Sequence, residues 1–265
     1  MTYKGAIDTR SAKEKSKDFH WEEFNVLGVV EFEERSAIGY TLRNQDGSGS
    51  CVAQTVAKML EVWDFKNDGT PTVYSATPIY QRRRNKPTPG MVGVDALQYA
   101  VDGHIYLESN VPSQNMNDDA MDTASINISL KRSEKPLSYS VLPINFYAVA
   151  QEIKTNNAVM VWFKCSVQEW STIVPEGRSS SESVRHSVTA VDIIQYNGEE
   201  YIVIEDSWGK LTKNSDIPIQ EGQRAISKQF FEDHCFFAAS FTKFEFDGGT
   251  KPKHYWNYVM RYGQK

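Results

Sequence analysis

The sequence has few of the features that define several large classes of protein. Only three of its 265 residues are cysteine, and they lie far apart at Cys51, Cys165 and Cys235. A disulfide framework or a zinc site needs paired cysteine or histidine residues at short spacing, so we expect neither. We therefore predict three free thiols, no metal and no cofactor. Free thiols fit a reducing compartment.

Long apolar runs and a positive charge excess are also missing. No run approaches the roughly 18 apolar residues that span a bilayer, and residues 1–25 mix charges of both signs instead of forming a signal peptide. Lys and Arg number 29 against 34 Asp and Glu, a net charge of -5. Such a chain has no overall field that attracts phosphate backbones or anionic lipid. We expect a cytoplasmic protein that binds neither nucleic acid nor membrane.

The composition is that of a folded protein with enough residues for one large or two ordinary domains, because 40% of the side chains are hydrophobic and 24% are charged. Apolar residues recur with helical period over residues 51–63, 92–101 and 143–153, whereas β-branched and aromatic runs cover residues 158–165, 187–196, 200–204 and 235–242. Helices dominate the first half and antiparallel strands the second. This order predicts the α+β class with a cleft between the two parts.

Cys51 is the first candidate nucleophile. It follows the turn-forming residues 44–50 and begins a predicted helix. A helix N-terminus favours the thiolate, which is the reactive form of cysteine. Gln45 lies six positions earlier, and its amide could stabilise the oxyanion that forms when sulfur attacks a carbonyl, together with the backbone N–H of Cys51.

His186 is the candidate base, and Asp206 is the candidate partner that orients its ring. If Asn197-Gly198 is a two-residue hairpin loop, paired residues have numbers that sum to about 395. This register sets His186 opposite Gly209, only a few residues from Asp206, and a β-bulge would close the remaining offset. A histidine oriented by a carboxylate can accept a proton from a nucleophile.

Together these segments resemble the papain-like cysteine peptidase family over about residues 30–245. Gln45-Asp46-Gly47-Ser48-Gly49-Ser50-Cys51-Val52 is similar to the family's Gln-Gly-Ser-Cys-Gly-Ser-Cys-Trp, and His186-Ser187-Val188 and Asp206-Ser207-Trp208-Gly209 are similar to its His-Ala-Val and Asn-Ser-Trp-Gly. The family places its histidine and asparagine about 130 to 150 residues after the cysteine. The resemblance also extends to Pro89-Gly90 and to residues 225–231 of bacterial members.

The resemblance implies a papain-like fold, in which a helical subdomain with a central nucleophile helix packs against an antiparallel β-barrel-like subdomain. It implies peptide hydrolysis through Cys51, His186, Asp206 and Gln45 and an acyl-enzyme, with no cofactor. The implied substrate groove involves Gly49, Ser50, Gly90, Ser187 and Trp208. Trp208 is expected to pack over the contact between His186 and Asp206.

The sequence departs from the family pattern in four ways. Asp206 replaces the usual asparagine, and Ser48 replaces a cysteine that forms a disulfide in papain. The second tryptophan-glycine after the DSWG segment is replaced by residues 210–223. About 30 residues precede the domain, which is too short for the long inhibitory prosegment of many members. The resemblance therefore predicts a core without disulfides and control by some other means.

We predict three regions: an N-terminal arm over residues 1–28, the peptidase domain over 29–245, with its helical part at about 45–140 and its β part at about 141–245, and a tail over 246–265. The remaining candidates are interpreted as structural. Cys165 and Cys235 are expected in the core, and Arg82-Arg83-Arg84 in a solvated loop. The other histidines, expected to face solvent or to bond locally, are His20, His104, His234 and His254.

Two other functions fit the same residues. A transglutaminase-type acyl transferase would use the same Cys-His-Asp residues with an amine in place of water. A papain-like assembly protein would bind a partner through the arm or the tail, and its catalysis would be weak or lost. In one version of this hypothesis the protein is associated with a virion. The separation of Cys51 from His186 and the presence of Gln45 favour the peptidase.

Overall fold

The computed structural model describes residues 3–7, 30–34, 36, 39–69, 72–155, 158–177, 183–211 and 215–245. Most of the predicted arm and the whole tail, with His20 and His254, lie outside the described residues. The predicted roles of arm and tail in partner binding and the predicted domain boundaries therefore stay predictions. No helix of the described part combines the length and the apolar character that crossing a membrane requires.

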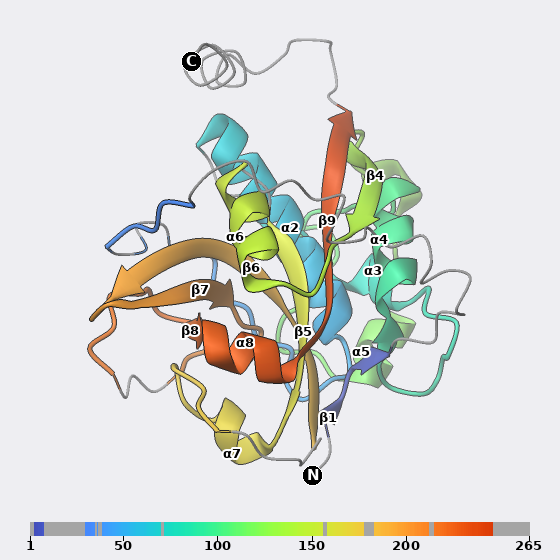
Figure 1. The fold of residues 1–265 in the computed structure, drawn as a ribbon. Coiled ribbons are helices and arrows are strands. Elements are labelled where there is room, and N and C mark those ends of the chain that lie inside the picture. The colour runs from blue at the N-terminus through green and yellow to red at the C-terminus, as the bar shows by residue number, and fades with distance from the viewer. Residues whose placement is uncertain are drawn as a thin grey trace, which may run out of the picture.

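The helix α2 (Cys51–Asp68) runs through the centre of the molecule. It is five residues longer than the apolar stripe predicts, and it ends at Gly69, whose left-handed backbone (φ 79°) lets its N–H bond to the carbonyl of Phe65. A glycine in this conformation is a common helix terminator. Figure 1 shows α2 passing behind the strands, so its buried face rests on them.

Seven of the described strands form one sheet, in the order β4-β9-β5-β6-β7-β8, with β1 pairing β6 as well. The strands are β1 (Tyr3–Lys4), β4 (Lys135–Val141), β5 (Val159–Cys165), β6 (Val184–Tyr196), β7 (Glu199–Glu205), β8 (Gln223–Ser227) and β9 (Cys235–Glu245). A second, two-stranded sheet pairs β2 (Ala6–Ile7) with β3 (Met91–Val92). Apart from the two parallel pairings made by β1 and β2, the ladders are antiparallel, which matches the prediction for the second half of the chain.

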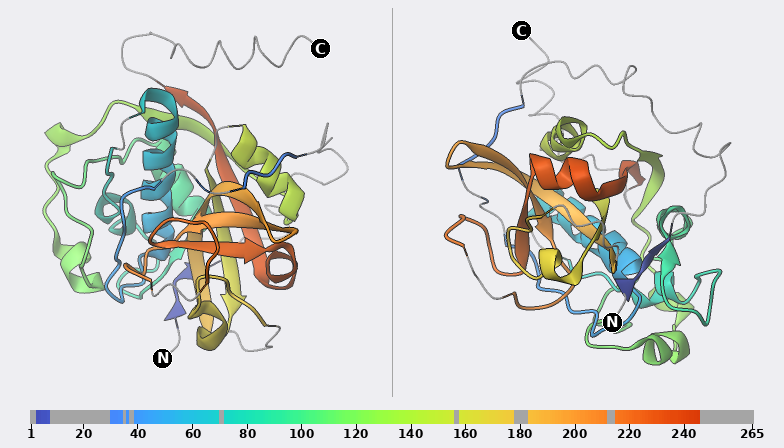
Figure 2. Two further views of the ribbon diagram at one scale, coloured as in Figure 1. Left: turned by 90° about the vertical axis from the view of Figure 1, so that its left-hand side faces the viewer. Right: turned by 60° about the horizontal axis from the view of Figure 1, so that its bottom comes forward.

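Helices cover both faces of the sheet, as the side view in Figure 2 shows. One face carries α2, α3 (Thr77–Tyr80) and α4 (Gly93–Val101), and the other carries α6 (Phe146–Lys154) and α8 (Lys228–His234). Side chains of β5 alternate between the two buried clusters, since Met160 and Trp162 face α2 whereas Val161 and Phe163 face α6 and α8. This alternation follows from the two-residue repeat of a strand.

The hairpin between β6 and β7 has the predicted loop and register. Asn197 and Gly198 have φ angles of 52° and 82°, as a type I′ turn requires. Tyr196 pairs with Glu199 and Asp192 with Val203, and a register shift follows between Asp192 and Ala190. The predicted hairpin and its bulge are therefore confirmed.

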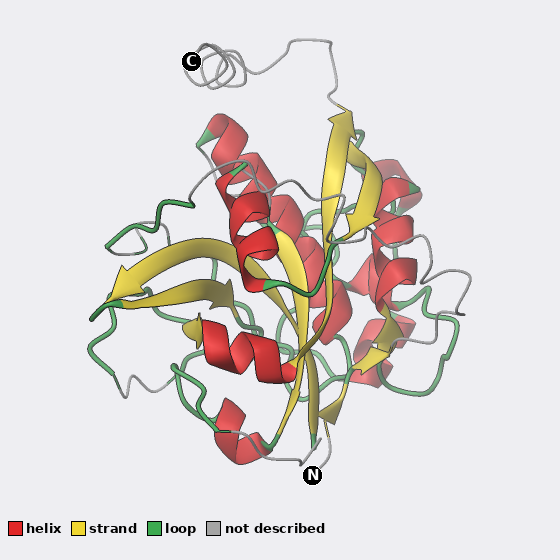
Figure 3. Cartoon of the chain, in the orientation of Figure 1, coloured by secondary structure: helices red, strands yellow, loops and turns green. Residues whose placement is uncertain are grey.

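Several short elements carried no clear pattern in the sequence. They are α5 (Asp118–Thr123), a 3-10 turn at Ile128–Leu130, α7 (Val167–Trp170) and the strands β1 to β4 and β8. Figure 3 shows that the long strands cross the middle of the molecule while most of these short pieces lie toward its edges. Short elements contain too few residues for a periodicity to emerge.

Candidate active site

Cys51 is the first residue of α2, as predicted, and it is buried with 1% of its surface exposed. Ser50 precedes it at the N-cap position, and its side chain makes no hydrogen bond that caps the helix. Cys51 acts on His186, since it is one of the two groups that raise the pKa of the His186 ring. The helix that was predicted from the sequence therefore presents its first side chain to the predicted base.

His186 lies near the start of β6, and its ring is held by Asp206. Nε2 lies 2.7 Å from Oδ1 of Asp206, and Cys51 is the second group that raises the pKa of the ring. The ring is covered by two tryptophans, with Trp208 at a centroid distance of 5.2 Å and Trp170 at 5.7 Å. Trp208 thus packs where the sequence places it, over the contact between His186 and Asp206.

Asp206 directly follows β7 and is buried at 2% exposure. Its Oδ1 accepts from His186 and from the backbone N–H of Ser207, at 2.7 Å each. Its Oδ2 accepts from Nε of Arg224 at 2.6 Å and from Nε1 of Trp170 at 3.2 Å. Four donors therefore fix both oxygens of this carboxylate.

The charges of these groups are set by one another. Burial lowers the pKa of His186, but the charge and hydrogen bonds of Asp206 and Cys51 outweigh burial and raise it to about 9. Burial acts in the opposite sense on Asp206, yet Arg224 and then His186 hold the pKa of the carboxyl well below its usual range. At neutral pH the site therefore contains an imidazolium beside a carboxylate.

Gln45 is buried and joins the two halves of the site. Its Oε1 accepts from the hydroxyl of Ser207 at 2.6 Å, and its Nε2 donates to the carbonyl of Ser48. The backbone N–H of Gln45 also donates to the carbonyl of Ser207 at 2.8 Å. The segment before α2 is thereby bonded to the segment after β7, and the Gln45 amide is held between the nucleophile loop and Asp206.

The groove residues fall into two groups. Gly49 and Gly90 approach each other closely, because a Cβ on Gly49 would lie 2.4 Å from the backbone nitrogen of Gly90. In contrast, the side chains of Ser50 and Ser187 are buried in the protein, the first beside the hydroxyl of Ser48 and the second donating to Thr55. Their side chains therefore bond inside the domain.

The first described residues of the chain lie across Cys51. Lys4 pairs with Arg185 of β6, and Ala6 pairs with Met91 of β3. Between them Gly5 donates its N–H to the carbonyl of Arg185 at 3.1 Å and accepts from the N–H of Met91 at 2.9 Å.

Gly5 touches the nucleophile itself. A Cβ at this position would lie 2.3 Å from the sulfur of Cys51. The segment Tyr3–Ile7 therefore spans the groove from the histidine wall to the glycine wall. It pairs with strands of both sheets, although the sequence predicted no element in the arm.

The structure tests several of the other candidates, and it differs from the prediction for His104, whose ring Nδ1 is buried without a hydrogen-bond partner. Cys165 and Cys235 are buried, and burial raises the pKa of each thiol to about 12. His234 bonds to the carbonyls of Lys164 and Gly177. The described residues contain no group of three or more His, Cys, Asp or Glu that could hold a metal ion.

The prediction of a solvated Arg82-Arg83-Arg84 loop is wrong for Arg83. Its side chain is buried against Tyr80 and paired with Asp122 of α5. Arg84, with 68% of its side chain exposed, pairs with Asp95. The loop thus fastens α5 and α4 through two of its three arginines, which a run of like charges does not reveal.

Sequence reasoning missed three contributors: Arg224, Trp170 and Gly5. Arg224 and Trp170 reach Asp206 from β8 and α7, which are distant in sequence. Only the resemblance of residues 225–231 to bacterial members marked the region beside Arg224. A glycine in a polar arm carried no signal.

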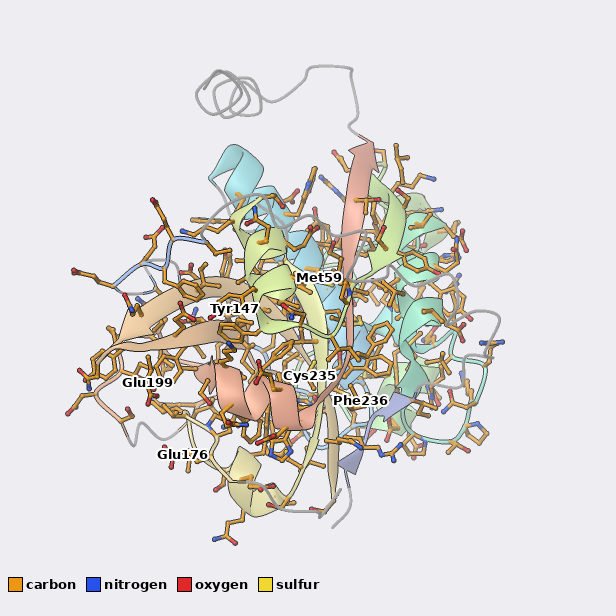
Figure 4. All side chains as sticks on the ribbon, in the orientation of Figure 1. Met59, Tyr147, Glu176, Glu199, Cys235 and Phe236 are labelled. Atoms are coloured by element: carbon orange, nitrogen blue, oxygen red, sulfur yellow. The ribbon has the colours of Figure 1, made fainter. Side chains whose placement is uncertain are left out.

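A large open groove of about 1110 Å³ lies elsewhere, between α7 and the hairpin of β6 and β7. Its walls include Glu176 and Glu199, which Figure 4 shows at the same side of the molecule. Its lining contains neither histidine nor cysteine, so the candidate chemistry stays at Cys51.

Comparison with known proteins agrees with the geometry. The family model of the papain family cysteine proteases matches residues 30–220. No curated protein matches the sequence of the chain. Several solved structures are similar in fold.

Digestive procathepsin L 3 from Tenebrio molitor larval midgut is 17% identical, with a TM-score of 0.65 over 81% of this chain and 70% of that one. Xylellain, a cysteine protease from Xylella fastidiosa, is 12% identical, with a TM-score of 0.69 over 91% of this chain and 96% of its own. Bromelain protease from Ananas comosus, solved with the inhibitor E64, is 15% identical, with a TM-score of 0.61 over 75% of this chain and 91% of that one. These likenesses show the papain-like fold and confirm the predicted α+β class.

Proposed function

Since the chain belongs to the papain family of cysteine proteases and is a cysteine peptidase, we propose that it hydrolyses peptide bonds through a Cys51-His186-Asp206 triad and an acyl-enzyme. The observation that carries the proposal is the ring of His186, which bonds to Asp206 and whose pKa is raised by Asp206 and Cys51 together. A base held between an orienting carboxylate and a thiol is the arrangement that activates a cysteine nucleophile.

In the first half of the reaction the thiolate of Cys51 attacks the carbonyl carbon of the substrate. The protonated ring of His186 favours the thiolate before attack and then donates its proton to the leaving amine, so the C–N bond breaks and a thioester remains. Gln45 and the backbone N–H of Cys51 stabilise the oxyanion. A donor of this kind contributes roughly 3 to 4 kcal/mol in a comparable site.

In the second half water attacks the thioester. His186, now neutral, accepts a proton from the water and keeps it, while the sulfur leaves as a thiolate and the acid product is released, so the starting ion pair is restored. Asp206 stays ionised and keeps the Nε2 side of the ring in place throughout. Trp208 and Trp170 exclude bulk water from this contact, which strengthens it because the local dielectric constant is low.

Covalent labelling tests the nucleophile directly. Iodoacetamide at low concentration is expected to label the full chain once, and Cys51→Ala is expected to abolish both the labelling and the cleavage of a peptide library. Cys165→Ala is the matched control, because a buried thiol with a pKa raised to about 12 does not compete for the reagent. Undiminished labelling of Cys51→Ala would overturn the assignment of the nucleophile.

One observation favours a second candidate, the assembly protein with weak catalysis, since Gly5 covers the sulfur of Cys51. Peptide cleavage by a variant lacking residues 1–7 separates the two candidates, because robust turnover supports the peptidase and its absence supports the assembly role. Adding a primary amine to the same assay tests the transferase alternative, for which aminated product is expected. A cytoplasmic or viral setting stays a prediction.

A further inference from the structure

The family's usual asparagine is a carboxylate in this chain, and a buried carboxylate needs a counter-charge. Asp206 has none of its side-chain surface exposed, and its Oδ2 faces away from the histidine. The guanidinium of Arg224 reaches that oxygen from β8 with Nε at 2.6 Å. The carboxylate therefore lies between two cations, His186 on Oδ1 and Arg224 on Oδ2.

Arg224 is itself held on every side. Only 1% of its side chain is exposed, and a second nitrogen donates to the carbonyl of Thr172. Its guanidinium lies 4.9 Å from the ring centre of Trp170 and 5.8 Å from that of Trp208. The same two tryptophans cover His186, so one pair of rings fixes both cations beside Asp206.

Charge balance gives this arrangement a consequence. With Cys51 as thiolate and His186 protonated, the addition of Asp206 alone would leave one net negative charge, whereas Asp206 with Arg224 leaves none. A neutral asparagine in the same place also leaves none. We propose that Arg224 is a positioning residue of the proposed reaction, which neutralises and orients Asp206 so that the ion pair replaces an amide behind His186.

The other charged groups near the site do not take over this task. Glu205, the neighbour of Asp206, bonds to Gln223 and lies 3.8 Å from Lys58 of α2. Glu169 of α7 caps its own helix through the N–H of Ser166. Asp206 and Cys51 are the groups whose charges raise the pKa of His186.

The inference rests on the proposed function, and its test has one readout that needs turnover and one that does not. In the full chain, NMR titration follows the ring of His186 while the pH profile of kcat/KM gives the pKa of its alkaline limb. Three variants are compared: Arg224→Gln, Asp206→Asn, and the double variant Asp206→Asn with Arg224→Gln.

The single variants should shift the pKa in opposite directions. Loss of Arg224 strengthens the negative field at the ring and should raise the pKa of His186 by about 1, whereas Asp206→Asn leaves Arg224 uncompensated and should lower it by at least as much. Each should reduce kcat/KM at pH 7 about tenfold or more. The double variant should return to within about threefold of the wild-type kcat/KM, because the charge behind the ring is again zero.

A merely structural role gives a different pattern. The losses in kcat/KM would then add in the double variant, and the pKa of His186 would not move in Arg224→Gln. Either result overturns the inference. Arg83→Gln, which removes another buried and paired guanidinium, is the matched control and should lower the melting temperature without moving the pKa. Where Arg224→Gln does not fold, Arg224→Lys keeps the charge and should retain the pKa with a lower kcat, and a shifted pKa in that variant counts against the inference.

Failure of the proposed function is recognisable separately. If the wild-type chain cleaves no peptide but the pKa of His186 still shifts in opposite directions in the two single variants, the peptidase proposal is overturned and the role of Arg224 stays in place. If the wild-type chain cleaves peptides but the pKa of His186 is the same in the variants, the role of Arg224 is overturned and the peptidase proposal stays in place.

Discussion

His186 keeps its charge because two partners outweigh its burial, and the pH dependence of the protein should follow from this balance. Its pKa in the folded chain is raised from 6.5 to about 9. A group whose folded pKa is raised contributes stability that is fully present below its unfolded pKa and is lost as the pH rises through the folded value. We therefore expect the free energy of unfolding to fall between pH 6.5 and about 9.

Urea unfolding at a series of pH values measures this dependence, with His186→Gln as the variant that should lack it. The peptidase activity should decline as the pH rises through about 9, since the ring that donates the proton to the leaving amine then becomes neutral. An activity that is flat to pH 10.5 would contradict this assignment of the acid.

Gln45 offers a second prediction at the scale of one side chain. In the proposed reaction the Gln45 amide donates to the developing oxyanion, so in Gln45→Ala kcat should fall by about 10² to 10³ with little change in KM. Ser207→Ala is the matched control, because it removes only the hydroxyl that bonds to Oε1 of Gln45 and should cost much less. Equal losses in the two variants would mean that Gln45 acts through the packing of the loop.

At the scale of elements, the segment Tyr3–Ile7 joins two separate sheets by lying between β6 and β3. Both backbone groups of Gly5 are used in this contact, since its carbonyl accepts from Met91 and its N–H donates to Arg185. The carbonyl of Gly5 is thus bonded to the groove wall and not to the N–H of Cys51.

Gly5→Val should displace this segment. The added Cβ would lie 2.3 Å from the sulfur of Cys51, well inside contact distance, so the strand must move away from the nucleophile. Iodoacetamide should then label Cys51 faster than in the wild-type chain, with an expected increase of about tenfold, the equivalent of 1.4 kcal/mol in access. Gly39→Ala is the matched control, because its Cβ would meet only Gln220 at 3.7 Å or more. An unchanged rate would mean that the segment does not limit access.

The whole molecule is held together by charges as well as by its two apolar clusters. Lys58 projects from α2 into the protein interior, where it lies 2.9 Å from Glu61 and 3.8 Å from Glu205 of β7. Burial lowers the pKa of Lys58 and raises that of Glu205, while each opposes the shift in the other. Helix and sheet are therefore joined by an ionic contact directly beside Asp206.

Lys58→Met should remove the cation that lies 3.8 Å from the buried Glu205 and leave the buried Glu61 paired with Arg43 alone. Breaking one side of a buried pair typically costs about 3 to 5 kcal/mol, so a loss of this size in the free energy of unfolding is expected from urea titration. Lys228→Met, which removes a pair with 44% and 50% of the two side chains exposed, should change stability by less than about 1 kcal/mol. Comparable losses of unfolding free energy in the two variants would show that the buried ion pair contributes no more to stability than the exposed one.

The parts that sequence predicts well are those whose signals are local. Cys51 begins a helix that is marked by its apolar repeat, and Asn197-Gly198 sets the register that carries His186 toward Asp206. Arg224 gave no such signal, because its partner lies 18 positions away and is reached only when β7 pairs with β8. Long-range pairing depends on the assembled sheet, and the same holds for Gly5 and for the burial of Arg83.

The bonds between the loop before α2 and the loop after β7 have a mechanical consequence. Gln45 donates its N–H to Ser207, Gly209 donates to Arg43, and Asn44 forms a bridge with Trp208. These bonds hold the loop that leads into Cys51 against the segment that follows Asp206. The cysteine and the pair of His186 and Asp206 therefore lie beside a contact between two loops that are distant in the sequence, and a substitution that breaks this contact should separate the sulfur from the ring.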